Sequence, residues 1–232
     1  MKYIFLIFYN FWENFFHLPR IKKFIKKNIF LKKPIIFDVG SHEGKVTKLF
    51  FNLYRNAKIY CFEPNKLLVQ KIKKNNIKKN IIICNYALGD QNGKEIININ
   101  NLNLTSSLSK LNSYSFYLKI KKLILGKNIS SYSQKINVIK LDKFCEIKKI
   151  KKIDLIKIDV EGYEYKVLLG AKKTIHNIHY VMIEVQKNNM YKDYSKKKIE
   201  KFLKKNNFIL LKKFNFPFMF FQDRLYENTK FD

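Results

Sequence analysis

Four acidic residues stand where short apolar segments end, in a chain that contains only 18 acidic residues in all. They are Asp38, Glu63, Asp159 and Glu184. Helical patterns separate the apolar segments, an alternation that predicts βαβ units and a mostly parallel sheet. Ligands bind at the carboxyl ends of the strands in such sheets, so the pattern predicts one acidic ligand-binding edge. Some of these acids could instead cap the helices that follow them. For Glu184, helix capping could be the whole role.

The expected elements form one α/β domain, as the length of 232 residues and the 47% of apolar residues allow. We expect this domain over residues 34–232, after an N-terminal segment of residues 1–33. Strands are expected at residues 35–38, 58–63, 81–85, 94–100, 136–141, 155–159, 181–184, 208–211 and 224–226, the last two antiparallel. Helices are expected at residues 46–54, 64–75, 163–175 and 195–205. An irregular insertion is expected over residues 98–134.

The N-terminal segment joins an apolar, aromatic stretch to a basic one at residues 20–27. Its unbroken apolar run is too short to span a bilayer. The absence of a small-residue cleavage site argues against a signal peptide. Two helices are therefore expected. Either they touch an anionic membrane through residues 1–27, or they pack on the domain with their lysines solvated, the alternative we favour. The expected location is cytoplasmic, with contact at the inner face of the membrane under the first alternative.

The net charge and the cysteines limit the possible partners and the cellular compartment only weakly. Lys and Arg total 47, for a formal net charge of +29, which suits an anionic partner. The excess is almost all lysine and accompanies many Ile and Asn residues, so A+T-biased coding explains it equally well. Cys61, Cys84 and Cys145 lack zinc-site spacing, and we expect buried free thiols in a reducing compartment.

The segment from Asp38 to Gly44 has the form of a strand, a glycine-containing turn and a helix start. Its Gly40-x-x-x-Gly44 spacing lacks the G-x-G-x-x-G pattern that brings backbone N–H groups to a pyrophosphate. S-adenosylmethionine has no phosphate and suits the looser turn, with Asp38 attracting its positive charge. Glu63 could accept hydrogen bonds from both ribose hydroxyls. An NAD-binding domain is the near alternative.

Several ordered motifs make a more specific case. They are Phe37-Asp38-Val39-Gly40, Phe62-Glu63-Pro64, Ala87-Leu88-Gly89-Asp90, Ser106-Ser107-Leu108, Leu141-Asp142, and Lys157-Ile158-Asp159-Val160-Glu161-Gly162-Tyr163-Glu164. Together they resemble the FkbM family of methyltransferases over about residues 34–186. The resemblance implies a class I, Rossmann-like fold with a seven-stranded sheet, S-adenosylmethionine as cofactor and, usually, O-methylation. It also implies cofactor contacts at Pro64 and Ala87.

The turn departs from the family pattern at one place. The family commonly has Ala-Asn after the first glycine, where this chain has Ser41-His42. His42 either contacts the polar end of the cofactor or replaces Asn as a turn residue, and we favour replacement. Both residues remain candidates for the cofactor site.

The reacting end is expected just beyond the strand at residues 155–159. Asp159 and Glu161 would lie on one side of an extended backbone, where either could take the proton of an acceptor hydroxyl. Lys157 could pair with them and lower their pKa. Asp159 could instead organise the loop, and Glu164 could belong to a solvated helix face. A divalent metal held by Asp159 and Glu161 is possible but not favoured, because few other ligands are evident.

The acceptor side is expected to include Ser106, Ser107 and Glu184, with the insertion at residues 98–134 as a lid. The favoured function is O-methylation of a sugar, a glycan or another small-molecule hydroxyl. The alternatives are an RNA methyltransferase, favoured only by the charge, and a degenerate, membrane-associated interaction module. Nucleic acid is not the favoured partner, because the loop at residues 159–162 lacks the Asn/Asp-Pro-Pro-Tyr/Phe pattern of adenine methylation and no Pro-Cys pair is present.

Overall fold

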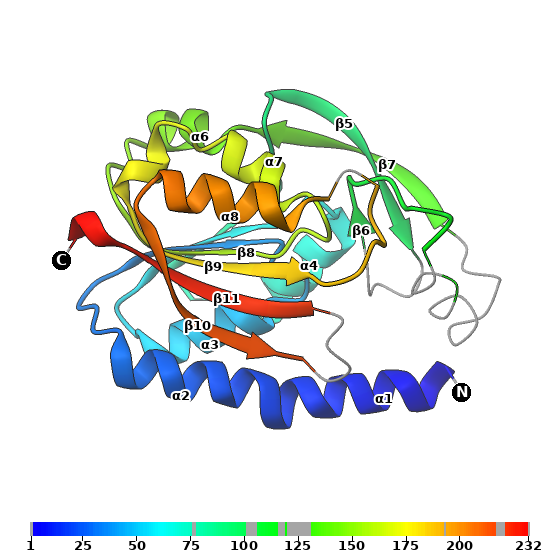
Figure 1. Ribbon diagram of the computed structural model, residues 1–232, viewed down its shortest axis with the longest axis horizontal. Coiled ribbons are helices and arrows are strands. Elements are labelled where there is room, and N and C mark those ends of the chain that lie inside the picture. Colours follow the sequence, from blue (N-terminus) through cyan, green and yellow to red (C-terminus); the bar gives the residue numbers. More distant parts are fainter. Residues whose placement is uncertain are drawn as a thin grey trace.

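The computed structural model in Figure 1 describes residues 2–75, 78–100, 106–115, 119, 131–192, 194–216 and 221–231. Its centre is a seven-stranded sheet with the order β10-β11-β9-β8-β1-β2-β3. The strands are β1 (Ile35–Val39), β2 (Lys58–Phe62), β3 (Ile81–Cys84), β8 (Ile153–Ile158), β9 (Ile178–Gln186), β10 (Phe208–Asn215) and β11 (Phe221–Asn228). β11 runs antiparallel to both of its neighbours, β9 and β10. The predicted seven-stranded, mostly parallel sheet is confirmed.

The register of the sheet brings the predicted acids to one edge. Asp38 in β1 lies opposite Lys157 in β8, and Val39 lies opposite both Phe62 and Ile158. Glu63 and Asp159 each follow directly after a strand end, so three of the four acids gather at the carboxyl ends of adjacent strands. β8 also pairs in parallel with β9, where Ile158 lies opposite Ile183, the residue before Glu184.

Helices cover both faces of this sheet (Figure 1). On one face, α6 (Leu141–Lys148), α7 (Glu164–Leu169) and α8 (Lys196–Lys205) place buried side chains such as Phe144, Val167 and Ile199 against the strands. On the other face, α3 (Lys45–Leu53) and an N-terminal helix contribute Leu49, Phe50 and their neighbours to a second buried cluster. The helix α4 (Lys66–Asn75) follows β2. Burial of these apolar faces is the main stabilising term of such a layered fold.

Two helical expectations need correction. The segment from Leu141 was expected to end a strand, but it begins α6, which the sequence did not predict. The helix expected at residues 163–175 is α7 followed, after a turn, by the 3-10 helix η2 (Thr174–Asn177). Another 3-10 helix, η4 (Thr229–Phe231), follows β11.

The strands that flank the expected insertion build a second sheet with the order β4-β7-β5-β6. It contains β4 (Ala87–Leu88), β5 (Gly93–Asn100), β6 (Ser106–Ser107) and β7 (Ser131–Ile139), with β5 and β7 forming a long antiparallel ladder. A small core, including Ile97, Ile99 and Ile136, holds it together. Residues 101–105, 116–118 and 120–130 of the expected insertion lie outside the described residues.

The N-terminal segment forms one continuous rod along the sheet, made of α1 (Lys2–Trp12), the π-helix η1 (Glu13–His17) and α2 (Leu18–Asn28). Ile21 and Ile25 of α2 are fully buried against the domain, so the packing alternative holds for α2. The outer side of α1, by contrast, exposes apolar side chains. No helix in the described part of the chain is long and apolar enough to cross a bilayer. The three cysteines are buried free thiols, as predicted.

Candidate functional site

The glycine turn after β1 is fixed to both neighbouring strands. The N–H groups of Gly40 and Ser41 donate to the Phe62 carbonyl at 3.0 and 3.1 Å. The Ser41 hydroxyl is buried and donates to the Asp38 carbonyl at 2.7 Å, so it holds the turn together. Gly40 and Gly44 both have a φ of +80°, the left-handed region that glycine adopts without strain.

Glycine is required at position 40 by a close backbone contact. A Cβ there would lie 1.8 Å from the carbonyl oxygen of Asp159. The close approach is therefore one to the backbone at the end of β8. This contact joins the glycine turn to the loop that carries Asp159 and Glu161.

His42 continues the turn with a φ of +50°, a conformation in which Asn and His are enriched among residues other than glycine. Its backbone N–H donates to the Glu63 carboxylate at 2.9 Å. This geometry agrees with the alternative in which His42 replaces Asn as a turn residue.

Glu63 and Asp38 are buried carboxylates on the cofactor side. Each oxygen of Glu63 accepts one backbone N–H, from His42 and from Asn65, both at 2.9 Å. Burial raises the pKa of Glu63 to about 7, although these two N–H groups lower it. Asp38 accepts a hydrogen bond from the Thr47 hydroxyl at 2.6 Å, and its other oxygen is buried without a partner among the described residues. Burial also raises the Asp38 pKa, against the charge of Lys157.

These carboxylates fit an adenosine-containing cation. Each Glu63 oxygen keeps a second lone pair for a ribose hydroxyl, and the unpartnered Asp38 oxygen can accept from an ammonium group or face a sulfonium. Asn85 positions the neighbouring loop by donating to the carbonyls of Glu63 and Pro64, both at 2.9 Å. Ala87 is buried in β4, where it pairs with Val138 of the second sheet.

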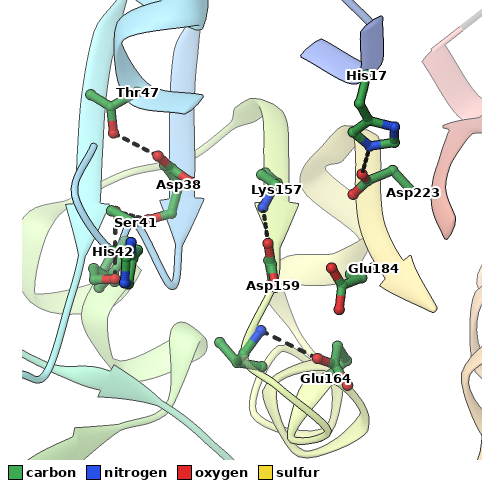
Figure 2. Close-up of polar contacts among 12 residues, drawn as sticks. His17, Asp38, Ser41, His42, Thr47, Lys157, Asp159, Glu164, Glu184 and Asp223 are labelled. Carbon is green, nitrogen blue, oxygen red and sulfur yellow. Dashed lines mark hydrogen bonds and ion pairs between the residues drawn. The ribbon is translucent and has the colours of Figure 1, made fainter. Parts of the chain in front are cut away.

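The expected acceptor side centres on Lys157 and Asp159, whose Nζ and Oδ2 atoms are 2.5 Å apart (Figure 2). The predicted pairing of Lys157 with a carboxylate is present. Figure 2 also shows Glu184 and Glu164 on the side of Asp159 that faces away from Asp38. The cluster therefore lies beside the cofactor turn along the same edge of the sheet.

Glu161 does not continue an extended backbone, as the sequence argument assumed. Its φ is +52°, and its carboxylate accepts a hydrogen bond from the Tyr191 hydroxyl. The Tyr191 ring packs so closely on Gly162 that a Cβ there would lie 2.4 Å from it. Tyr191 also forms a β-bridge with Leu111, which ties this loop to the insertion.

Glu164 is not on a solvated helix face, so that alternative is wrong. It is fully buried, and its Oε1 accepts the backbone N–H groups of Val160 and Gly162 at 3.2 and 3.0 Å. Burial raises its pKa to about 8, although these N–H groups lower it. Glu164 thus organises the turn that presents Asp159 and Glu161.

Glu184 is not a helix cap either. It lies within β9, two residues before its end, and α8 begins only at Lys196. Its buried carboxylate accepts from the Gln186 amide, and Asp223 of β11 lies opposite it. Burial, followed by the charges of Asp159 and Glu161, raises its pKa well above the usual value. Glu184 therefore belongs to the acceptor-side cluster.

The remaining sequence candidates lie in the second sheet. Ser106 and Ser107 form β6, at the edge of that sheet beside β5. The described part of the insertion meets the loop after β9, where the Asn112 N–H donates to the Met190 carbonyl at 2.7 Å. Within the described residues, no group of three or more His, Cys, Asp or Glu side chains could hold a metal ion.

Sequence reasoning missed several residues of this site. Thr47 lies in the first turn of α3, and its role follows only from the contact with Asp38. Tyr191 and Asp223 reach the acceptor side from segments distant in sequence. Asn65 caps α4 by accepting from the Leu67 N–H at 3.0 Å, which an Asn after Pro64 could have signalled.

The strand order, with one antiparallel strand, and the acidic edge define the class I, Rossmann-like methyltransferase fold. The chain belongs to the FkbM methyltransferase domain family, whose model matches residues 38–210. The predicted family is thus confirmed.

Two methyltransferases from other organisms resemble the chain at low identity. The 2-O-methyltransferase NoeI of Sinorhizobium fredii is 24% identical over 161 residues, which are 68% of this chain and 65% of the relative. The hexuronic acid methyltransferase AglP of Haloferax volcanii is 23% identical over 164 residues, which are 70% of this chain and 60% of the relative. The chain thus aligns with less than two thirds of each relative's length.

Solved structures agree in fold. Magnesium protoporphyrin IX methyltransferase from Synechocystis, with bound S-adenosylmethionine, superposes with a TM-score of 0.52 at 10% identity, over 91% of this chain and 77% of that one. A Rossmann-superfamily protein from Streptococcus agalactiae gives 0.51 at 12% identity, over 92% and 68%. At such identities the likeness concerns the fold alone.

Proposed function

We propose that the protein transfers a methyl group from S-adenosylmethionine to a hydroxyl of a sugar or glycan. The observation that carries this proposal is the Gly40–Asp159 contact, which joins the cofactor turn to the acceptor-side carboxylates in one rigid edge. The names of the two relatives, a 2-O-methyltransferase and a hexuronic acid methyltransferase, support a sugar acceptor.

The cofactor side would be held by residues of the turn and of the loop after β2. Glu63 receives the ribose hydroxyls, Asp38 faces the positive charge, and the backbone at residues 40–44 lines the ligand, with Ser41 and His42 shaping the turn. Pro64 and Ala87 flank this side. When bound, the cofactor supplies an electrophilic methyl group on a sulfonium.

On the acceptor side, a carboxylate takes the proton of the sugar hydroxyl as the oxygen becomes a nucleophile. Asp159 and Glu161 are the proposed bases, and Glu184 binds the acceptor beside them. Lys157 keeps Asp159 in place through their ion pair. Ser106, Ser107 and the described part of the insertion line the acceptor, since the insertion contacts the Tyr191 loop through Leu111.

The test separates binding from transfer. S-adenosylhomocysteine should bind the wild type in calorimetry and should lose most of its affinity in Glu63→Ala. Asp159→Asn and Glu161→Gln should keep that affinity while methyl transfer from labelled cofactor to glycosides falls at least ~100-fold, the usual range for a lost proton acceptor. Full activity in both carboxylate variants would refute the assignment of the base.

We also propose that the N-terminal rod rests on an anionic membrane surface. Its outer side exposes a helical stripe in α1 and η1: Ile4, Ile7, Phe8, Phe11 and Phe15, with Ile4 72% and Ile7 68% exposed. The outer side of α2 carries exposed basic residues at positions 20, 22, 23, 26 and 27. An apolar stripe beside a basic stretch is the composition of an interfacial helix.

Vesicle sedimentation tests this contact. The wild type should bind phosphatidylserine-containing vesicles more strongly than pure phosphatidylcholine, and salt should weaken the binding. The double variant Ile7→Ser/Phe11→Ser should lose it. Ile147→Ser is the matched control, because Ile147 is 56% exposed on α6, in the helix layer on the opposite face. Equal binding by the double variant would exclude the stripe.

A further inference from the structure

The inner side of the N-terminal rod follows the domain along its whole length. The residues at every fourth position are Tyr9, Glu13, His17, Ile21 and Ile25, and each of them is buried or partly buried. On a regular α-helix, positions four apart drift by about 40° at each step. The π-helical turn of η1 is wider than an α-turn, so it reduces the angular drift along the rod. The polar residues at positions 9, 13 and 17 therefore lie on the same side of the rod as the buried apolar residues of α2. They form a polar face that extends toward the carboxyl edge of the sheet.

His17 anchors this polar face. Its Nε2 lies 2.7 Å from the Asp223 carboxylate, with side-chain exposures of only 4% and 7% (Figure 2). Asp223 is the cross-strand neighbour of Glu184 in β9. The rings of Phe216 and Phe221 also pack on His17, with centroids at 5.3 and 6.3 Å. The contact between His17 and Asp223 thus fixes the rod next to the acceptor-side cluster.

Two turns earlier in α1, Tyr9 lies at the carboxyl edge itself. Its ring centroid is 4.9 Å from that of Phe216, whose N–H donates to the Phe221 carbonyl. Phe221 lies opposite Gln186, the last residue of β9. Figure 1 likewise shows α1 at the end of the sheet where the β9 arrow points.

The same segment reaches the cofactor turn. Lys45 begins α3 directly after Gly44, and its Nζ lies 2.6 Å from Glu13 and 3.2 Å from Asn10. The rod therefore spans the edge from β10 and β11 to the glycine turn. In the strand order, β9 and β8 lie between β11 and β1, so Glu184 and Asp159 lie between the two ends of this span.

The electrostatics of Tyr9 agree with this placement. Burial raises the pKa of its hydroxyl well above the usual value, and the charges of Glu13, Glu184, Asp159 and Glu161 raise it further. The hydroxyl thus stays protonated at neutral pH and can donate a hydrogen bond.

We propose that α1 and η1 form a wall of the acceptor site, and that Tyr9 binds the acceptor there through its hydroxyl. The N-terminal segment thus contributes directly to the acceptor site. This inference rests on the proposed function for the nature of the acceptor, but the position of Tyr9 can be tested without any acceptor.

The first experiment uses the full chain labelled with carbon-13 at the tyrosine ring Cζ, with Tyr9→Phe to assign the signal. The Tyr9 resonance should shift in Glu184→Gln. The Tyr54 resonance should stay in place, because Tyr54 lies shortly before the amino end of β2, away from the carboxyl edge, and its hydroxyl donates to the Ile29 carbonyl at 2.9 Å. An unmoved Tyr9 signal would overturn the placement.

The second experiment measures transfer to methyl glycosides of a hexuronic acid and of a neutral hexose. Tyr9→Phe should lower kcat/KM for the acceptor about tenfold, mainly through KM, while the affinity for S-adenosylhomocysteine is unchanged. Tyr54→Phe should match the wild type. Unchanged kcat/KM in Tyr9→Phe would refute the proposal that α1 and η1 form a wall of the acceptor site. It would not affect the proposed function. Transfer to neither glycoside by the wild type would refute the proposed acceptor class, and the labelled tyrosine would still decide the placement.

Discussion

The ammonium of Lys157 lies 2.5 Å from the carboxylate of Asp159, and the Lys157 side chain is only 5% exposed. Burial by itself would lower the Lys157 pKa, but the charges of Asp159, Asp223 and Asp38 together hold it above the usual value. One buried cation thus faces three carboxylates that belong to β1, to β11 and to the loop after β8. It compensates charges on both the cofactor side and the acceptor side.

Replacing Lys157 with Met should therefore destabilise the fold strongly. The substitution keeps the length of the side chain but leaves buried carboxylates without a compensating charge, which typically costs about 3–5 kcal/mol. Urea unfolding at neutral pH would measure the loss.

Lys152→Met is the matched control for this change. Lys152 also lies two residues before an aspartate, with its Nζ 2.9 Å from Asp154, but its side chain is 51% exposed. An exposed pair contributes about 0–1 kcal/mol, so the control should unfold close to the wild type. Equal losses in the two variants would show that burial of the pair does not matter.

The contrast between these two pairs shows what the sequence could not reveal. Lys152-x-Asp154 and Lys157-x-Asp159 have the same local pattern, and only the neighbours from β1 and β11 distinguish them. The sheet itself was predictable, because the apolar strands and the acids at their ends are local features. The helix α6 was not, because the residue before it, Lys140, offers no capping side chain and Leu141 extends the preceding apolar run.

The structure agrees more closely with the geometry expected for the cofactor side than with that expected for the acceptor side. Asp38, Gly40 and Glu63 belong to a strand–turn–helix pattern that is continuous or nearly so in sequence. By contrast, His17 and Asp223 are 206 positions apart, and no local pattern could join them. Glu164 looked like an exposed residue in the first turn of a helix, and its burial depends on the loop that folds back over it.

Glu63 should give cofactor binding a characteristic pH dependence. Its pKa of about 7 means that the carboxylate is mostly neutral at pH 6 and mostly charged at pH 8. If the charged form accepts the ribose hydroxyls, the affinity for S-adenosylhomocysteine should rise about tenfold over this interval, because only the charged fraction is competent. Calorimetry at several pH values would measure it.

Two variants would check that assignment. Glu63→Gln should bind weakly, with little dependence on pH in this range. Glu43→Gln should behave like the wild type, since Glu43 lies in the same turn but is partly exposed and pairs with Lys71 at 3.1 Å. A rising affinity that persists in Glu63→Gln would assign the titration to another group.

Glu164→Gln should change how stability varies with pH. Because burial raises the Glu164 pKa from 4.5 to about 8, its contribution is fully present below pH 4.5 and is lost as the pH rises through 8. Glutamine keeps an oxygen for the N–H groups of Val160 and Gly162 and carries no charge. From pH 5 to pH 9 the wild type should therefore lose about 4 kcal/mol relative to the variant.

Chemical unfolding of both proteins across that range provides the measurement. Glu146→Gln on α6 should show no such difference, because the Glu146 side chain is 70% exposed. Parallel stability curves for the wild type and Glu164→Gln would contradict the buried, neutral state of this carboxyl.

Gly40→Ala should disrupt the junction between the two halves of the site. The new methyl group would lie 1.8 Å from the Asp159 carbonyl oxygen, so the end of β8 would have to move, and the φ of +80° adds strain of about 1–2 kcal/mol. Gly93→Ala is the control for strain alone, because its φ is +146° and no atom lies within 4 Å of the added Cβ. Thermal unfolding should show a much larger loss for Gly40→Ala, and any folded fraction should lose transfer activity because Asp159 is displaced. A Gly40→Ala protein that matches the control in both properties would mean that the turn and the carboxylate loop are not coupled.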